Sequence, residues 1–188
     1  MSQRFRVYTT CRGLPNQIHG GPGTGKTLTA DSVAELTERP LYRVNCGDIG
    51  TNAEKVERYL ESVLYLGTAW QCVVRLDEAD IFLEERTQQD LKRNALVSVF
   101  LRVLEYYSGI LFLTSNQVGT FDEAFKSRVH LTLHYPTLEE ASRRRIWSNF
   151  ITRPTVRTTV LERLDELAAL KLNGREIRNS IRTAHVAG

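Results

Sequence analysis

The feature that most constrains this chain is a glycine-rich run near its N-terminus, Gly20-Gly21-Pro22-Gly23-Thr24-Gly25-Lys26-Thr27. The run fills every fixed position of the pattern G-x-x-x-x-G-K-[ST]. Glycines let the backbone fold so that successive N–H groups point inward, which makes a cradle for phosphate oxygens. The alternative, a glycine-rich turn that happens to precede a helix, is disfavoured because every fixed position is filled. The run therefore predicts a phosphate-binding loop followed by a helix.

Each residue type in this loop has a chemical use. The helix expected from Thr27 to about Glu38 directs the positive end of its dipole at the same point as the loop N–H groups. Lys26 can reach the β- and γ-phosphates of a nucleotide, and the Thr27 hydroxyl can ligate Mg²⁺. We expect Lys26 to act in catalysis as well. The predicted nucleotide contacts in this segment are Gly20, Gly21, Pro22, Gly23, Thr24, Gly25, Lys26, Thr27 and Leu28.

Strand-like and helix-like stretches alternate along the chain, which argues for a parallel sheet flanked by helices. The first strand is expected before the glycine-rich run and the last one, which alternates in polarity, at a sheet edge. The predicted fold is α/β, a three-layer αβα sandwich with a mainly parallel five-stranded sheet. The strands are expected at 14–19, 41–45, 72–76, 110–113 and 129–134, and further helices at 54–66, 90–106 and 137–150.

The pattern becomes all-helical after Pro154, with helices expected over 160–170 and 174–185. We therefore place a core that contains the phosphate-binding loop at residues 1–153 and a small, truncated helical lid at residues 154–188. Only 19 residues stand before Gly20, so we expect a fragment that lacks a separate recognition domain before the loop.

Composition narrows the class of protein. The 188 residues carry 25 Lys and Arg against 22 Asp and Glu, a net charge of +3 that is too small to indicate nucleic-acid binding. The three cysteines form no C-x-x-C pair, which indicates a reducing compartment and disfavours a disulfide frame or a zinc site. The sequence has no apolar run of the roughly 20 residues that span a bilayer. We expect a cytoplasmic or nuclear location, or an organelle if an upstream targeting segment is missing.

Two acids, Asp77 and Glu78, follow an apolar strand about 50 residues after the loop. An Asp at the tip of the strand can hold Mg²⁺, and the adjacent Glu can polarise a water for attack on the γ-phosphate. The alternative is a pair of acids that stabilise a helix N-terminus. After a phosphate-binding loop, the pair favours metal binding by Asp77 and water activation by Glu78.

The next apolar strand ends in Thr114, Ser115 and Asn116. Ligands gather at the carboxyl ends of parallel strands, so these side chains are expected to face the same crevice as the loop. Asn116 would then orient the attacking water or touch the γ-phosphate. A simple turn at Asn116 is the alternative, because the following residues are turn-prone.

Four segments in this order resemble the AAA ATPases of the wider AAA+ class. The loop looks like Walker A, Leu76–Asp80 like Walker B, Thr114–Asn116 like sensor 1, and Phe121–Arg128 like the segment that ends in the arginine finger. The weaker match Asn173–Glu176 is placed like sensor 2. The residues and spacing of these motifs are most similar to those of large fungal AAA proteins and, more distantly, to those of mitochondrial respiratory-chain assembly ATPases of this family.

The resemblance implies ATP and Mg²⁺ as cofactors and a homo-oligomeric ring, usually of six, that remodels a protein client. It also implies that Arg128 acts in trans on the nucleotide of a neighbouring subunit, and that Arg175 senses the nucleotide. A surface arginine is the alternative at both positions. Hydrolysis of ATP is the function expected. The alternatives are a nucleotide-binding scaffold with little turnover and a clamp-loader-like, DNA-associated ATPase, which Ser127-Arg128 superficially matches.

Three departures from the family pattern bear on activity. The strand before the loop is poor in apolar residues and contains Pro15. One hypothesis is that residues of this strand have been lost from the sequence. Arg75 shares strand parity with Asp77 and is expected to point into a helix-covered face, where it needs a carboxylate partner or a route to solvent. The loop after the second strand, 47–51, has no aromatic residue. Family members that thread a polypeptide usually have one there, so we do not assume that this protein threads a polypeptide.

Overall fold

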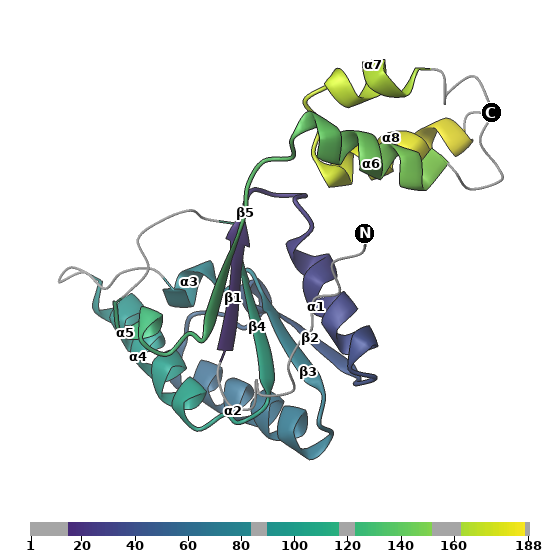
Figure 1. Ribbon diagram of the computed structural model, residues 1–188. Helices are drawn as coiled ribbons and strands as arrows, with labels where there is room; N and C mark the ends of the chain where they lie inside the picture. The colour runs from purple at the N-terminus through teal and green to yellow at the C-terminus, as the bar shows by residue number, and fades with distance from the viewer. Residues whose placement is uncertain (1–14, 84–89, 117–122, 152–162, 187–188) are drawn as a thin grey trace. The chain divides into compact units, whose positions relative to one another are not determined.

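The computed structural model of the chain describes residues 15–83, 90–116, 123–151 and 163–186 (Figure 1). They fall into two compact units. The first holds the sheet residues up to His19 together with Thr27–His134, and the second holds Gly20–Lys26 together with the residues from Tyr135 onward.

A five-stranded sheet forms the centre of the first unit, in the order β2-β3-β4-β1-β5. The pairs β2 with β3, β3 with β4 and β4 with β1 are parallel, as the alternation of strands and helices predicts. The last strand lies at an edge, as its alternating polarity predicts. The strands are β1 Pro15–Gly20, β2 Leu41–Asn45, β3 Val73–Asp77, β4 Ile110–Ser115 and β5 Leu131–Tyr135.

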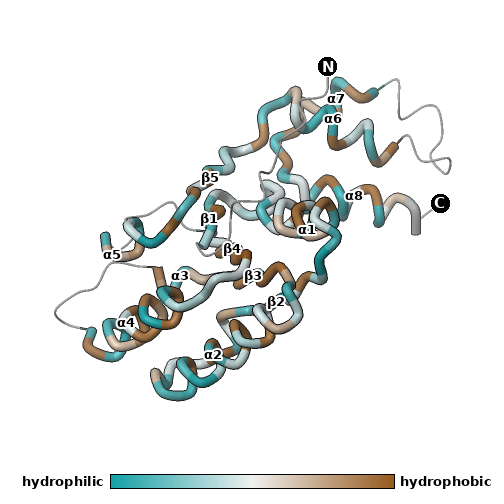
Figure 2. Tube along the Cα trace, turned by 60° about the horizontal axis from the view of Figure 1, so that its bottom comes forward, coloured by the Kyte–Doolittle hydropathy of each residue, from teal (hydrophilic) through white to brown (hydrophobic). Residues whose placement is uncertain are grey.

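Helices cover both faces of this sheet. Helix α1 (Lys26–Leu36) lies on one face, and α2 (Ala53–Ala69) and α4 (Leu91–Glu105) lie side by side on the other (Figures 1 and 2). Asn52 and Asp90 cap these two helices through their side-chain oxygens. The short elements are η1 (Cys46–Asp48), α3 (Asp80–Leu83) and α5 (Glu123–Lys126). The buried core lies between the sheet and the α2–α4 layer, where Leu60, Phe82, Phe100 and Leu113 are fully enclosed.

Strand β1 forms despite its polar sequence. Asn16 and Gln17 are 4% and 2% exposed, and the Asn16 side-chain amide donates to the carbonyl of Leu111 at 3.3 Å. Pro15 stands at the first position of the strand, where a missing N–H is tolerated, and its carbonyl accepts from His130 N at 2.9 Å. A strand poor in apolar residues is thus held by backbone pairing on both sides.

Three helices make the bulk of the second unit: α6 (Glu140–Ile151), α7 (Leu164–Ala169) and α8 (Gly174–Val186). They pack around Trp147, Ile151 and Ile177. Arg143, from the basic run 143–145, donates to the carbonyls of Ala168 at 2.7 Å and Leu138 at 2.6 Å, so it joins the helices. The predicted domain boundary at residue 153 lies outside the described residues and stays a prediction. None of the helices in the described ranges is long and apolar enough to cross a membrane.

Candidate active site

The glycine-rich loop turns back on its own lysine. Gly20, Gly23 and Gly25 adopt positive φ angles of 148°, 70° and 105°, which side chains other than glycine rarely adopt. The Lys26 ammonium is buried and donates to the carbonyls of Gly20 at 2.6 Å and Gly21 at 2.7 Å. The loop therefore has the conformation that its glycines predict, with a cation held at its centre.

The lid helix α8 begins at this loop, within the second unit. The N–H of Gly174 donates to the carbonyl of Gly23 at 2.9 Å. Asn173 caps α8 by accepting from the N–H groups of Arg175 and Glu176, and the Glu176 carboxylate accepts from Asn173 N at 2.7 Å. The Arg175 side chain is exposed, so its sensing role stays a prediction.

In the first unit, the carboxylate of Asp77 lies at the end of β3 and is bound at both oxygens. Its Oδ1 accepts from the Thr114 hydroxyl at 2.8 Å. Its Oδ2 accepts from Arg75 twice, from Nε at 2.9 Å and from Nη2 at 2.7 Å. The sequence pointed to Asp77 and the end of β4, and the structure brings the two together.

Arg75 connects this carboxylate to helix α1. Its side chain is 5% exposed, and its Nη1 lies 2.5 Å from Asp31 Oδ1 and 3.3 Å from the carbonyl of Thr27. Arg43 reaches the same Asp31 oxygen at 3.4 Å from the solvent side. Arg75 therefore has carboxylate partners, which answers the question that the sequence left open. Asp31 was missed by the sequence reasoning, although its place one helical turn after Thr27 is a usable signal.

Glu78 occupies a sharp turn directly after β3. Its φ of 58° is left-handed, a conformation uncommon for a residue other than glycine. The N–H of the next residue, Ala79, donates to the carbonyl of Thr114 at 3.0 Å, which holds the turn against β4. A Cβ built on Gly47 would lie 3.5 Å from Glu78 Oε2, so the carboxylate lies beside the η1 corner. Strain of this kind is common at functional sites.

The acids around this corner affect a buried thiol. Cys46 is fully enclosed, and burial raises its pKa to about 12, with further contributions from the charges of Asp77, Asp80 and Glu78. Asp80 also accepts a hydrogen bond from Ser115 at the end of β4. The ends of β3 and β4 thus bring the carboxylates of Asp77, Glu78 and Asp80 close to Cys46 in the first unit.

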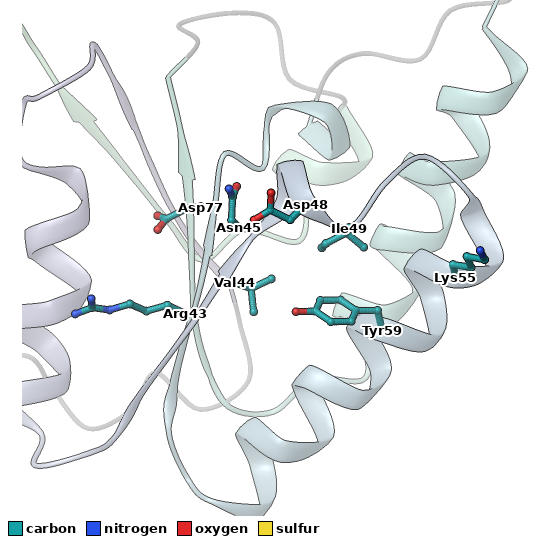
Figure 3. Close-up of a pocket in the computed structure, with 8 residues that line it drawn as sticks. All are labelled: Arg43, Val44, Asn45, Asp48, Ile49, Lys55, Tyr59 and Asp77. Carbon is teal, nitrogen blue, oxygen red and sulfur yellow. The ribbon is translucent and has the colours of Figure 1, made fainter.

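A cavity of about 610 Å³ opens next to this corner (Figure 3). Tyr59 reaches into it from α2 toward Val44, and Arg43 points to the opposite side of β2. The residues that line the cavity come from β2, η1, α2 and β3: Arg43, Val44, Asn45, Asp48, Ile49, Lys55, Tyr59 and Asp77. Asp77 is the predicted site residue that borders it.

Thr27 and Asp77 fit a magnesium ion by their chemistry. A hydroxyl and a carboxylate are hard oxygen ligands, and Mg²⁺ usually takes only one or two carboxylates besides nucleotide phosphates and waters. Thr27 is exposed, and Arg75 ties the carbonyl of this residue to Asp77. In the described part of the chain, no group of three His, Cys, Asp or Glu side chains is arranged to hold a metal by itself. This donor set therefore suits an ion that arrives with a nucleotide.

Two more predicted catalytic residues, Asn116 and Arg128, also lie in the first unit. Asn116 is exposed directly after β4. Arg128 is half-buried: its Nη1 donates to the carbonyl of Ala124 at 2.9 Å, and its Nη2 lies 3.5 Å from Glu105. Of the remaining loop residues, Pro22 and Leu28 are exposed. The roles of these side chains stay predictions.

The family model "ATPase family associated with various cellular activities (AAA)" matches residues 17–137, which is more than half of the chain. The chain belongs to the AAA family. The residues that the family model matches include the glycine-rich loop, Asp77, Glu78, Asn116 and Arg128. The resemblance that the motifs indicate is confirmed at the level of the family, and ATP hydrolysis is the activity that the family model describes.

Several curated AAA proteins are similar to this chain. "ATPase family AAA domain-containing protein 3B" of Homo sapiens is 28% identical over 155 residues, covering 76% of the chain and 24% of that protein. A Xenopus laevis relative, "ATPase family AAA domain-containing protein 3-B", is 30% identical over 76% of the chain and 26% of its own length. The "Putative 26S proteasome regulatory subunit homolog" of Methanothermobacter thermautotrophicus is 25% identical over 95% of the chain and 49% of that protein.

The chain thus spans about a quarter to half of the length of these relatives. A solved structure of similar fold belongs to an E. coli MS115-1 HORMA:CdnC:Trip13 complex. Its TM-score is 0.59 at 18% identity, with 84% of this chain and 59% of that chain covered. This likeness confirms the predicted α/β fold. Similarity to particular fungal or mitochondrial members stays a prediction.

Proposed function

We propose that this AAA chain binds ATP with Mg²⁺ and hydrolyses it to ADP and phosphate. The observation that carries the proposal is the complete loop, with positive-φ glycines and a buried lysine ammonium at its centre. Loop N–H groups and Lys26 would bind the phosphates. Thr27 and Asp77 would hold Mg²⁺, which when bound offsets the negative charge of the phosphate oxygens.

The remaining side chains have roles in the attack of water. Glu78 accepts a proton from the water as its oxygen bonds to the γ-phosphorus, and the bond from that phosphorus to the bridging oxygen of ADP breaks. Asn116 orients the water or contacts the γ-phosphate. In this proposal Arg128 stabilises the transferring phosphoryl group of a neighbouring protomer, because a guanidinium suits a dispersed negative charge.

A trans role of Arg128 requires an oligomer, and the resemblance to the AAA family makes a homo-oligomeric ring of six the expected form. We propose that turnover in this ring remodels a macromolecular client. The client is not identified by any residue of the chain, and the loop 47–51 has no aromatic residue that would grip a polypeptide. Polypeptide threading is therefore not assumed in the proposal.

A second candidate function is a nucleotide-binding scaffold with little turnover. The observation that favours it is the pairing of Arg75 with Asp77, because that carboxylate is already neutralised by its own chain. Binding without hydrolysis is the expected behaviour of such a scaffold.

Steady-state phosphate release separates the two functions, with Lys26→Ala as the matched control. An ATPase releases phosphate continuously, and Lys26→Ala lowers the rate by roughly a hundredfold or more because it removes a preorganised positive charge from the phosphates. A scaffold binds a fluorescent ATP analogue but gives equal, background rates for both proteins. Wild-type protein that neither binds the analogue nor releases phosphate contradicts the proposal as a whole.

A further inference from the structure

We propose that Arg75 is a resident cation on the carboxylate of Asp77 and that it weakens the binding of divalent metal ions at this site. The inference rests on the proposed function for the assignment of Asp77 as the carboxylate that faces the metal. Arg75 is thus a positioning residue, which acts through Asp77 and not on the nucleotide itself.

The guanidinium is fixed in place by contacts at all three of its nitrogens. Two of its nitrogens, Nε and Nη2, contact Asp77 Oδ2, and Nη1 contacts Asp31 at 2.5 Å and the carbonyl of Thr27 at 3.3 Å. The side chain is 5% exposed, and arginine side chains in proteins carry a permanent positive charge. The positive charge is therefore permanent and cannot move into solvent without breaking several charge-assisted bonds.

The Arg75 guanidinium occupies a position that would suit a divalent cation. Asp31 and Asp77 both direct a carboxylate oxygen at the guanidinium, and the Thr27 carbonyl adds a third oxygen. Hard oxygen donors of this kind are the usual ligands of Mg²⁺ and Mn²⁺. A metal ion that approaches Asp77 meets a like charge a few ångströms away, in a site that solvent screens poorly.

Arg43 provides a matched comparison within the chain. It contacts the same Asp31 oxygen at 3.4 Å, but its side chain is 61% exposed. Solvent screening makes such exposed ion pairs weak. If net charge alone set the metal affinity, removal of either arginine would have the same effect. If the buried position matters, only removal of Arg75 changes the affinity.

Electron paramagnetic resonance of Mn²⁺ measures the effect directly, with no nucleotide present and no dependence on turnover. The wild-type chain is expected to bind Mn²⁺ weakly. Arg75→Met, which keeps the length of the stem, is expected to bind one Mn²⁺ at least roughly tenfold more tightly, because a buried like charge has been removed. Arg43→Met and Arg75→Lys are expected to stay within about twofold of the wild type, since the first charge is screened and the second is kept.

Addition of Asp77→Asn to Arg75→Met is expected to abolish the gain. Equal affinities of wild type and a folded Arg75→Met variant overturn the proposal, and so does a gain that persists without Asp77. Should Arg75→Met fail to fold, Asp31→Asn with Arg75→Met leaves a single carboxylate in that space. That variant is expected to bind Mn²⁺ at least about threefold more tightly than wild type, and no gain overturns the proposal.

The Mn²⁺ measurement is distinct from the test of the proposed function. A chain that gains Mn²⁺ affinity through Arg75→Met but binds no ATP analogue contradicts the proposed function and supports the role of Arg75. A chain that hydrolyses ATP but shows no gain contradicts the role of Arg75 alone.

Discussion

At the scale of single residues, Asp77 shows how one carboxylate is positioned by its neighbours. Thr114 binds one oxygen and Arg75 the other, so the side chain has a defined orientation at the end of β3. A hydrogen bond to a charged group contributes about 1.5–3 kcal/mol to stability, more than a neutral one. The orientation of Asp77 thus depends on the side chains of Thr114 and Arg75.

Thr114→Val tests this dependence, because valine keeps the shape of threonine and removes the hydroxyl. We expect the free energy of unfolding to fall by about 2 kcal/mol, since Asp77 Oδ1 loses its donor. Urea denaturation measures this change. Thr114→Ser keeps the hydroxyl and is expected to lose only about 1 kcal/mol, from one methyl group. A larger loss for serine than for valine would show that the hydrogen bond is not what Thr114 contributes.

Sequence reasoning identified the charged residue in the strand but not its partners. The parity of Arg75 and Asp77 follows from the two-residue period of a strand, and the need for a partner follows from the cost of a buried charge. That the partner is Asp31 depends on how α1 packs across β3, a tertiary fact. The local pattern of α1 does not distinguish Asp31 from the other polar residues of the helix.

At the scale of elements, long periodic segments were predicted better than short ones. The predicted helix 90–106 is α4, Leu91–Glu105, and the predicted helix 54–66 is α2, Ala53–Ala69. The four-residue helices α3 and α5 were not predicted, because one turn has no periodicity to detect. The predicted helix 160–170 forms over Leu164–Ala169, and residues 160–162 lie outside the described ranges.

Gly20 and Gly21 offer a matched pair of substitutions in the loop. A Cβ on Gly20, which has a positive φ, would lie 2.2 Å from the backbone carbonyl oxygen of Tyr135. A Cβ on Gly21 would meet only the Thr24 methyl, at 3.8 Å. We expect Gly20→Ala to cost on the order of 3 kcal/mol or more, from strain and overlap, and Gly21→Ala less than about 1 kcal/mol.

The urea midpoints of the two variants decide this prediction. Equal stabilities would mean that the close approach of Gly20 to Tyr135 does not constrain the loop. The close approach of the Tyr135 backbone is thus enough to require glycine at position 20, the first position of the motif, even without a bound phosphate.

At the scale of the whole molecule, the class of fold was predictable and the order of strands was not. Alternation of strands and helices predicts a parallel sheet, but nothing local indicates that β1 lies between β4 and β5. This order places polar β1 in the interior of the sheet, where backbone pairing compensates for its sequence. AAA proteins are generally oligomeric, so the proposed trans role of Arg128 concerns an assembly of several chains.

A trans role of Arg128 predicts complementation between two inactive variants. Arg128→Ala keeps its own phosphate site but supplies no guanidinium, and Lys26→Ala supplies Arg128 but binds nucleotide poorly. We expect each to hydrolyse ATP slowly when alone and an equimolar mixture to recover a substantial fraction of the wild-type rate, because an arginine supplied in trans contributes on the order of a thousandfold or more. Phosphate release measures the recovery, and size-exclusion chromatography with ATP checks that the mixture assembles. A mixture no more active than its components would place Arg128 outside the neighbouring site.

The central claim, that this chain hydrolyses ATP through its Asp77–Glu78 corner, is tested most directly by Glu78→Gln. Glutamine keeps the size of the side chain but cannot accept the proton of the attacking water. The measurement is phosphate release under single-turnover conditions, with ATP binding followed in the same samples. The account predicts binding like that of the wild type and hydrolysis slower by roughly 100- to 10,000-fold. Hydrolysis at the wild-type rate with binding intact would contradict it.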